Sequence, residues 1–340
     1  EAKTFVGNGP FTLEEWNHGS HLKAKKNESY WDAKSVHLKE IEMVMVKVDT
    51  ELMMYEKKEL DWAGSPLSSL PFDALIALRK EQQLKVKPFL ATYFIRTNTQ
   101  AAPFDHPLLR KAFALAISRK QIIEHVLQGD QIPATGMVPT SMGLRGEPYF
   151  ADADIATAKQ LFDQVMRERN LTVEQFPEVR LMYVTSERNH LIAQTLQQQW
   201  FDAFGVRISL EGIERKVYYD KLSKQDYQLA SSNWVADFND PCNFLEAFKF
   251  KQGSSNNTAW EQPDYIKLLD QASRTAGTEE RLSLLRKSEK LLIEEMPVIP
   301  IYHFTMLYVN QDRIKDVVLS SMGGIDFKWA SMNQEQGDKQ

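Results

Sequence analysis

The chain has 340 residues, 43% of them hydrophobic, which is enough to bury a large core and to form two domains. Its formal net charge of -5 argues against the basic surface that nucleic-acid binding requires. The single cysteine, Cys242, excludes an intrachain disulfide, and no apolar run is long enough to cross a membrane.

The region before Phe89 predicts short strands and two helices. Apolar and polar residues alternate in its strands, and Pro71 stands at the start of the second helix. The expected strands cover residues 11–13, 21–25 and 38–46, and the expected helices cover residues 50–58 and 71–80.

From Phe89 onward, strands and helices alternate. An aromatic strand at 92–98 precedes a helix at 107–118, whose apolar residues recur at helical spacing. We expect further helices at 121–127, 154–169, 189–204 and 217–223, two long helices after Pro263, and strands at 179–184, 206–212 and 297–302. A loop rich in glycine and proline covers 128–148. Interleaved strands and helices predict an α/β layered fold.

The segment 233–241 carries the most informative chemistry. It follows an apolar-leaning run, and it places Asp237 and Asp240 near Trp234. A carboxylate and an indole delivered to the end of a strand have the ingredients of an ammonium pocket. The alternative is a strand that ends in an Asp-Pro turn, because Asp, Asn and Pro also satisfy turn geometry.

Sequence motifs of enzyme active sites are absent. The glycines between residues 136 and 146 have neither the spacing nor the lysine of a phosphate loop, and no Gly-x-Ser-x-Gly elbow occurs. His18 and His21 lack a third ligand nearby, so we expect no metal site and no cofactor. The pair Asp237 and Asp240 leaves a hydrolase with two carboxylates as a remote alternative.

Several separated segments resemble, in the family's order, signatures of the peptide/nickel-binding proteins of ABC importers. They are GNGPFTL at 7–13 with NESYW at 27–31, PFDHPLLRKA at 103–112, AISR at 116–119, WVADFNDP at 234–241, SSNN at 254–257 and PVIPIY at 297–302. The likeness is nearest to the oligopeptide-binding proteins of that family. One such motif is weak, whereas all of them in register are specific.

The resemblance implies an α/β fold of periplasmic-binding-protein-like lobes that close over a ligand at their junction. Family members carry a long segment before the first signature, so we expect an N-terminally truncated chain with one complete α/β lobe plus the C-terminal part of the other. Lobe I, incomplete, would cover 1–90 and 305–332, the complete ligand-binding lobe II would cover 91–304, and 333–340 would be a disordered tail.

The resemblance also implies site residues. In the oligopeptide-binding relatives an aspartate pairs with the ligand α-ammonium, and Asp237 matches it. Trp234 matches the aromatic residue beside it, which would wall a side-chain pocket. Asn256 and Thr258 match loop residues that hydrogen-bond the ligand backbone, and Phe304 stands in place of a tyrosine that contacts the ligand main chain.

Other positions depart from the family pattern. Ser231 replaces a basic residue that can meet a peptide carboxylate, and Asn189 replaces a histidine at the ligand end. Arg96 replaces an acidic residue and would meet a carboxylate at a different distance if it points into the cleft; a solvated or ion-paired arginine is the alternative. Val235 replaces a cysteine and so removes the family's disulfide in this lobe. The remaining candidates are Asn233 and Phe94.

Together these residues predict an extracytoplasmic solute-binding protein of an ABC importer, and not an enzyme. It would capture short peptides through the Asp237 anchor and main-chain hydrogen bonds. The expected partners are the peptide and the importer's permease subunits, with no nucleic acid. We expect a periplasmic or extracytoplasmic monomer that meets the membrane only through a lipid anchor or the permease. The alternative is the same fold bound to a murein peptide, haem or a metal chelate.

Overall fold

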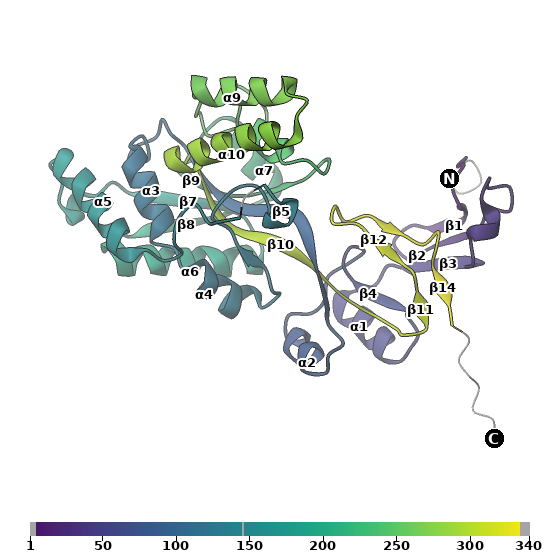
Figure 1. Ribbon diagram of the computed structural model, residues 1–340. Coiled ribbons are helices and arrows are strands. Elements are labelled where there is room, and N and C mark those ends of the chain that lie inside the picture. The colour runs from purple at the N-terminus through teal and green to yellow at the C-terminus, as the bar shows by residue number, and fades with distance from the viewer. Residues whose placement is uncertain (1–4, 145, 334–340) are drawn as a thin grey trace. The chain divides into compact units, whose positions relative to one another are not determined.

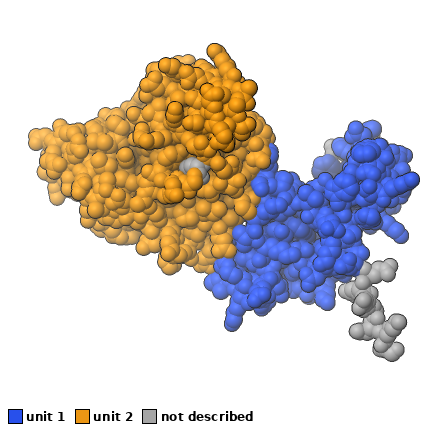
Figure 2. Space-filling view, viewed as in Figure 1, with its two compact units in different colours: residues 1–87, 306–340 blue, residues 88–305 orange. Residues whose placement is uncertain are grey.

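The computed structural model describes residues 5–144 and 146–333. The chain divides into two compact units, unit 1 with residues 1–87 and 306–340 and unit 2 with residues 88–305 (Figure 2). Strands β5 (Lys85–Thr97) and β10 (Val298–Asn310) carry the chain from one unit to the other. The sequence predicts the boundaries after residues 90 and 304. Most of the predicted tail, residues 334–340, lies outside the described residues.

Unit 1 contains an antiparallel sheet in the order β1-β2-β3. A separate apolar cluster packs its helices against β10, through Leu52, Tyr55, Leu75, Leu78 and Val309. The elements are β1 (Phe11–Asn17), β2 (His21–Lys26), β3 (Glu40–Val44), α1 (Val48–Glu56), β4 (Trp62–Gly64), α2 (Ala74–Lys80) and the two-residue strands β11 (Ile314–Lys315), β12 (Val318–Leu319), β13 (Ile325–Asp326) and β14 (Ser331–Met332).

Unit 2 is built on a mixed sheet with the strand order β10-β5-β9-β7-β8, and β4 and β6 also pair with β10. Its other strands are β6 (Ile132–Pro133), β7 (Val179–Val184), β8 (Ile208–Ile213) and β9 (Leu229–Val235). Strand β9 runs antiparallel to β5 and parallel to β7, and β7 runs parallel to β8. The carboxyl ends of β7, β8 and β9 therefore meet at one edge of the sheet, which is where α/β proteins commonly bind ligands.

Helices cover both faces of this sheet (Figure 1). One face carries the large core, in which Phe113 of α3 contacts Trp200 and Phe204 of α6. On the opposite face α7 packs through Tyr218 and Leu222. The helices are α3 (Pro107–Leu115), α4 (Arg119–Gln121), α5 (Ile155–Glu168), α6 (Glu187–Phe204), α7 (Arg215–Ser223), α8 (Cys242–Glu246), α9 (Pro263–Arg274) and α10 (Thr278–Glu295), with a π-helix at Ile122–Leu127 and 3-10 turns at Ala33–Ser35, Thr140–Met142 and Val173–Gln175.

The α/β layered fold predicted from the sequence is confirmed, and most element predictions match within a few residues. Three predictions were wrong in detail. The strand expected at 297–302 continues to Asn310, the aromatic strand begins at Lys85, and the helix expected from Pro71 begins at Ala74. Strand β10 continues because its residues Tyr308 to Asn310 pair with β4 beyond the apolar run, which a local pattern does not reveal.

Candidate functional site

The register between β5 and β9 sorts the candidate residues onto two faces of the sheet. Trp234 pairs with Thr92, Ser232 with Phe94, and Asn233 with Tyr93. Because side chains alternate along a strand, residues paired across the ladder share a face. The first face carries Phe94, Arg96 and Trp234, and the second carries Ser231 and Asn233.

On the first face, Arg96 is a buried cation, 4% exposed, that binds groups of its own unit. Its Nε donates to Ser232 Oγ (3.2 Å), and its Nη1 donates to the carbonyl oxygens of Ser255 (2.8 Å) and Asn256. The guanidinium carbon lies 5.1 Å from the centroid of the Phe94 ring. Burial lowers the pKa of Arg96. The side chain thus ties the loop at 255–256 to the sheet, and its contact with a ligand carboxylate stays a prediction.

The loop that Arg96 holds contains two further candidates, both fully buried. Asn256 Nδ2 donates to the carbonyl oxygens of Phe248 (3.2 Å), Phe250 (3.1 Å) and Trp260 (2.9 Å). Asn256 Oδ1 accepts from the amide (3.1 Å) and hydroxyl (2.5 Å) of Thr258. These side chains therefore shape the loop, and hydrogen bonds to a ligand would have to come from the backbone nearby.

On the second face, Ser231 lies among buried tyrosines. Its carbonyl oxygen accepts from the Tyr218 hydroxyl, and burial raises the pKa of Tyr93, on the same face as the Ser231 side chain, to about 12. Tyr93 stacks on Tyr302, with centroids 5.0 Å apart, and Phe304 meets Tyr302 edge-on at 5.0 Å. Asn233, opposite Tyr93, is exposed. Phe304 thus belongs to a row of aromatic contacts with Tyr302 and Tyr93, which no motif in the sequence indicated.

Asp237 comes directly after the last ladder contact of β9. The amide of Ala236 donates to the carbonyl oxygen of Leu90 (2.8 Å), so the backbone is fixed to β5 up to the residue before the aspartate. Asp237 is exposed, and none of the ion pairs among the described residues involves its carboxylate. Within the described residues, the charge of this carboxylate is therefore not balanced by an ion pair.

One buried amide, that of Asn243 in α8, joins Asp237 to Trp234. Trp234 Nε1 and the Asp237 amide both donate to Asn243 Oδ1, at 3.0 and 3.1 Å, and Asn243 Nδ2 donates to Asp237 Oδ2 at 3.3 Å. Asn243 is 7% exposed. No motif in the sequence marks this residue; its signal is an amide at the second position of a helix that follows the Asp-Pro turn.

Asp240, the second acid of the segment, is already paired. Arg281 Nη1 and Nη2 each lie 2.9 Å from one carboxylate oxygen, and the Cys242 amide donates to Oδ1 at 2.9 Å. Burial raises the pKa of Asp240, but the bonds from Arg281 and Cys242 outweigh it and hold the pKa below its ordinary value. This carboxylate stabilises the start of α8, and as a paired anion it does not suit the hydrolase alternative.

Asn189 lies at the same sheet edge, in the first turn of α6. Its Nδ2 donates to the carbonyl oxygen of Val184 (2.8 Å), the last residue of β7. Because β7 and β9 are parallel neighbours, both strands end on the edge that carries Asp237. No contact joins Asn189 to Asp237 in the part of the chain that the structure describes.

Within residues 5–144 and 146–333, no group of three His, Cys, Asp or Glu side chains is arranged to hold a metal ion. His18 instead lies against Trp16, with ring centroids 4.3 Å apart. None of the described helices is both long and apolar enough to span a membrane.

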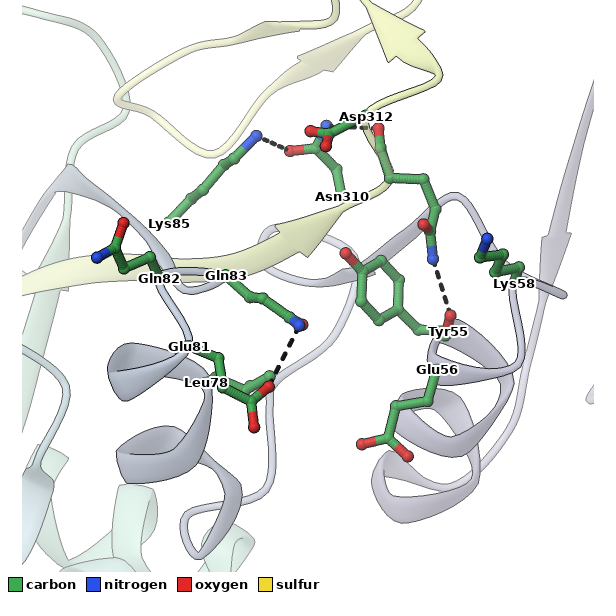
Figure 3. A pocket seen from close by; sticks show the side chains of 11 residues that line it. Tyr55, Glu56, Lys58, Leu78, Glu81, Gln82, Gln83, Lys85, Asn310 and Asp312 are labelled. Atoms are coloured by element: carbon green, nitrogen blue, oxygen red, sulfur yellow. Dashed lines mark hydrogen bonds between the residues drawn. The ribbon is translucent and has the colours of Figure 1, made fainter. Parts of the chain in front are cut away.

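A hollow of about 590 Å³ lies in unit 1, away from all of the candidate residues (Figure 3). Lys85 Nζ donates to Asn310 Oδ1 (2.6 Å) and Gln311 Nε2 donates to the carbonyl oxygen of Tyr55 (2.8 Å) at its wall. Burial and the nearby Asp312 raise the pKa of Tyr55. The lining is mainly polar, and none of the candidate residues belongs to it.

Comparison with known proteins identifies the class of the molecule as a solute-binding protein. Residues 1–256 match the model of the bacterial extracellular solute-binding proteins, family 5 (middle). The chain belongs to this family, whose members are binding proteins and not enzymes.

Individual relatives agree with this assignment. The chain is 40% identical to the oligopeptide-binding protein OppA of Bacillus subtilis over 95% of its length and 60% of that protein. It is 32% identical to the dipeptide-binding protein DppE of Bacillus subtilis over 98% of its length and 61% of that protein. A solved structure of the murein tripeptide-binding protein MppA, in its unliganded open form, shares the fold with a TM-score of 0.80 at 24% identity, covering 98% of this chain and 65% of that one. The chain therefore spans about 60% of the length of the curated relatives it matches.

Proposed function

We propose that this chain provides the peptide-binding lobe of an extracytoplasmic solute-binding protein that delivers short peptides to an ABC importer. Asp237 accepts the ligand α-ammonium, and the ligand main chain is held by backbone hydrogen bonds. The observation that carries the proposal is the contrast within one segment: Asp240 is paired with Arg281, whereas Asp237 is exposed and forms no ion pair with any described residue.

The surroundings of Asp237 support an ammonium as the ligand group. Trp234 offers an indole to a cation, and the Asn243 amide holds the indole and the carboxylate together. Main-chain recognition with an ammonium anchor gives broad tolerance of side chains, because the groups it reads occur in every peptide.

The far end of the ligand needs a different partner from the one in relatives. Ser231 carries no charge, and Arg96 is occupied by carbonyl oxygens and aromatic rings. We propose that the ligand carboxylate is bound by water or by the chain at the edge near Asn189, and that ligand length is weakly defined.

Titration calorimetry on the full-length protein tests the anchor. Trialanine is compared with N-acetyltrialanine, which keeps the main chain and lacks the charged amine, and a free murein tripeptide tests the alternative ligand. Asp237→Ala should weaken trialanine binding about tenfold to about 100-fold, the range of a hydrogen bond to a charged group. Asp163→Ala, which removes an exposed carboxylate of α5, is the matched control. Equal affinity of the wild-type protein for both peptides would remove the anchor.

A further inference from the structure

Among the described residues, Asn243 is the only one whose side chain hydrogen-bonds to both Asp237 and Trp234. It is buried, whereas Asp237 is exposed and Trp234 is half-buried. Its amide oxygen accepts two hydrogen bonds and its amide nitrogen donates one, so both kinds of group on the amide are used. A buried polar group with all its bonds directed at two candidate ligand contacts is arranged to orient them.

We propose that Asn243 is a positioning residue that fixes Asp237 and Trp234 as a single ammonium pocket and so sets the preference for ligands with a free α-ammonium. The inference rests on the proposed function, because it concerns the selectivity of the same anchor. It adds a residue that touches no ligand itself and acts through the two that do.

The hydrogen-bond pattern determines which oxygen of Asp237 meets the ligand. Asn243 Nδ2 donates to Oδ2 of Asp237, while Oδ1 of Asp237 accepts no hydrogen bond from the described residues. An exposed aspartate otherwise samples several rotamers, and ligand binding would have to select one of them. Holding Oδ2 in place leaves Oδ1 oriented before the ligand arrives, which is how preorganisation improves affinity.

The indole is oriented by the same atom that fixes the backbone of the aspartate. Asn243 Oδ1 accepts from Trp234 Nε1 and from the Asp237 amide, so the ring and the carboxylate cannot move independently. A cation is attracted to the face of an indole and also to a carboxylate, and both attractions depend on geometry. Loss of Asn243 should therefore lower the preference for ligands with a charged amine, and should weaken binding of the peptide main chain much less.

Asn243→Leu keeps the shape of the side chain and removes all three hydrogen bonds. The measured quantity is the ratio of the dissociation constants of N-acetyltrialanine and trialanine for the full-length protein. We expect Asn243→Leu to lower this ratio at least about fivefold and Asp237→Ala to bring it close to one. The control Asn239→Leu alters an exposed asparagine of the same segment and should leave the ratio unchanged.

The double variant separates positioning from a general structural effect. If Asn243 acts through Asp237, the variant D237A/N243L should have the same ratio as D237A alone, since the oriented group is already gone. Additive losses would overturn the proposal.

Asn243→Asp provides a second variant should Asn243→Leu fail to fold. An ionised carboxylate still accepts from the indole and the backbone amide but cannot donate to Asp237, whereas a protonated one can do both. Its selectivity should rise toward the wild-type value as the pH falls from about 7 to about 5, because neighbouring carboxylates favour binding a proton. A ratio that is independent of pH and equal to that of the wild type would contradict the proposal.

The results also distinguish this inference from the proposed function. If the wild-type protein binds both peptides equally, the Asp237 anchor fails and Asn243 has nothing to position. If the wild type is selective and N243L is equally selective, only the inference about Asn243 fails.

Discussion

Arg281 holds Asp240 with two parallel hydrogen bonds of 2.9 Å, and no described side chain forms such a pair with Asp237. The two acids look equivalent in the sequence. Bidentate pairing gives Asp240 a structural role. Its carboxylate neutralises the Arg281 guanidinium and also accepts a hydrogen bond from the backbone at the start of α8. Asp237, in contrast, forms no ion pair with any of the described residues.

Exchange of each acid for its amide should separate binding from stability. Asp240→Asn should lower the free energy of unfolding by about 1–2 kcal/mol, since a partly buried charged pair is lost, while the folded protein still binds peptide. Asp237→Asn should leave stability within about 0.5 kcal/mol and weaken peptide binding. Urea denaturation and calorimetry on the same preparations measure both quantities. The opposite pattern would mean that the roles of the acids are exchanged.

Stability should depend on the ionisation of Asp240 at acidic pH. The pKa of Asp240 is held below its ordinary value of 3.8 in the folded state. Its contribution is therefore fully present above the unfolded-state pKa and is lost as the pH falls through the lower, folded-state pKa. The difference in melting temperature between the wild type and Asp240→Asn should be constant above about pH 5 and shrink below about pH 4. A difference that grows on acidification would show that the pairing is not the cause.

The thiol of Cys242 should be unreactive in the folded protein. Burial, followed by the neighbouring Asp240 carboxylate, raises the pKa of Cys242 to about 12. Only the thiolate is alkylated, so iodoacetamide at about pH 8 should react at least about tenfold more slowly than with an unstructured cysteine. Asp240→Asn should accelerate the reaction. Since Cys242 is the only cysteine, mass spectrometry of the intact chain reports this site alone, and the urea-unfolded protein gives the reference rate.

Arg96→Lys should loosen the loop at 254–258 although the positive charge is kept. Lysine lacks the planar fork that reaches both Ser232 and the carbonyl oxygens of Ser255 and Asn256. We expect a loss of about 2–3 kcal/mol in unfolding free energy and faster amide hydrogen exchange at 254–258. Arg207→Lys, at an exposed arginine, should change neither. Unchanged exchange in the loop would show that Arg96 does not hold it.

The sequence predicted the helices and strands well because unit 2 follows simple periodicities. The apolar residues of α3 recur at helical spacing, and β7 is a short apolar run in which Leu181, Met182 and Tyr183 are all buried. The two-residue strands near the C-terminus carry no such signal, and they were missed. Their pairing, such as Ile314 with Met332, joins segments too short to show a pattern.

The site was predicted only in part. The family motif led to Asp237 and Trp234, but it did not distinguish Asp237 from Asp240, because the partner Arg281 comes from another helix. The sequence also does not show that Arg96 donates to carbonyl oxygens. Every residue type has a backbone carbonyl, so the identity of the acceptor residues gives no signal. The opposite orientation of Asn233 and Trp234 follows from strand alternation alone, and it could have been anticipated.

The hydrogen bond from the Ala236 amide to the Leu90 carbonyl has a consequence for how such a protein diversifies. It holds the chain immediately before Asp237, so a change at the exposed Phe238 need not displace the anchor. Mutation can then alter the walls around a bound solute while the point of attachment stays where it was. Related proteins can therefore evolve new preferences for ligand side chains while they keep the anchor for the ammonium group that all these ligands share.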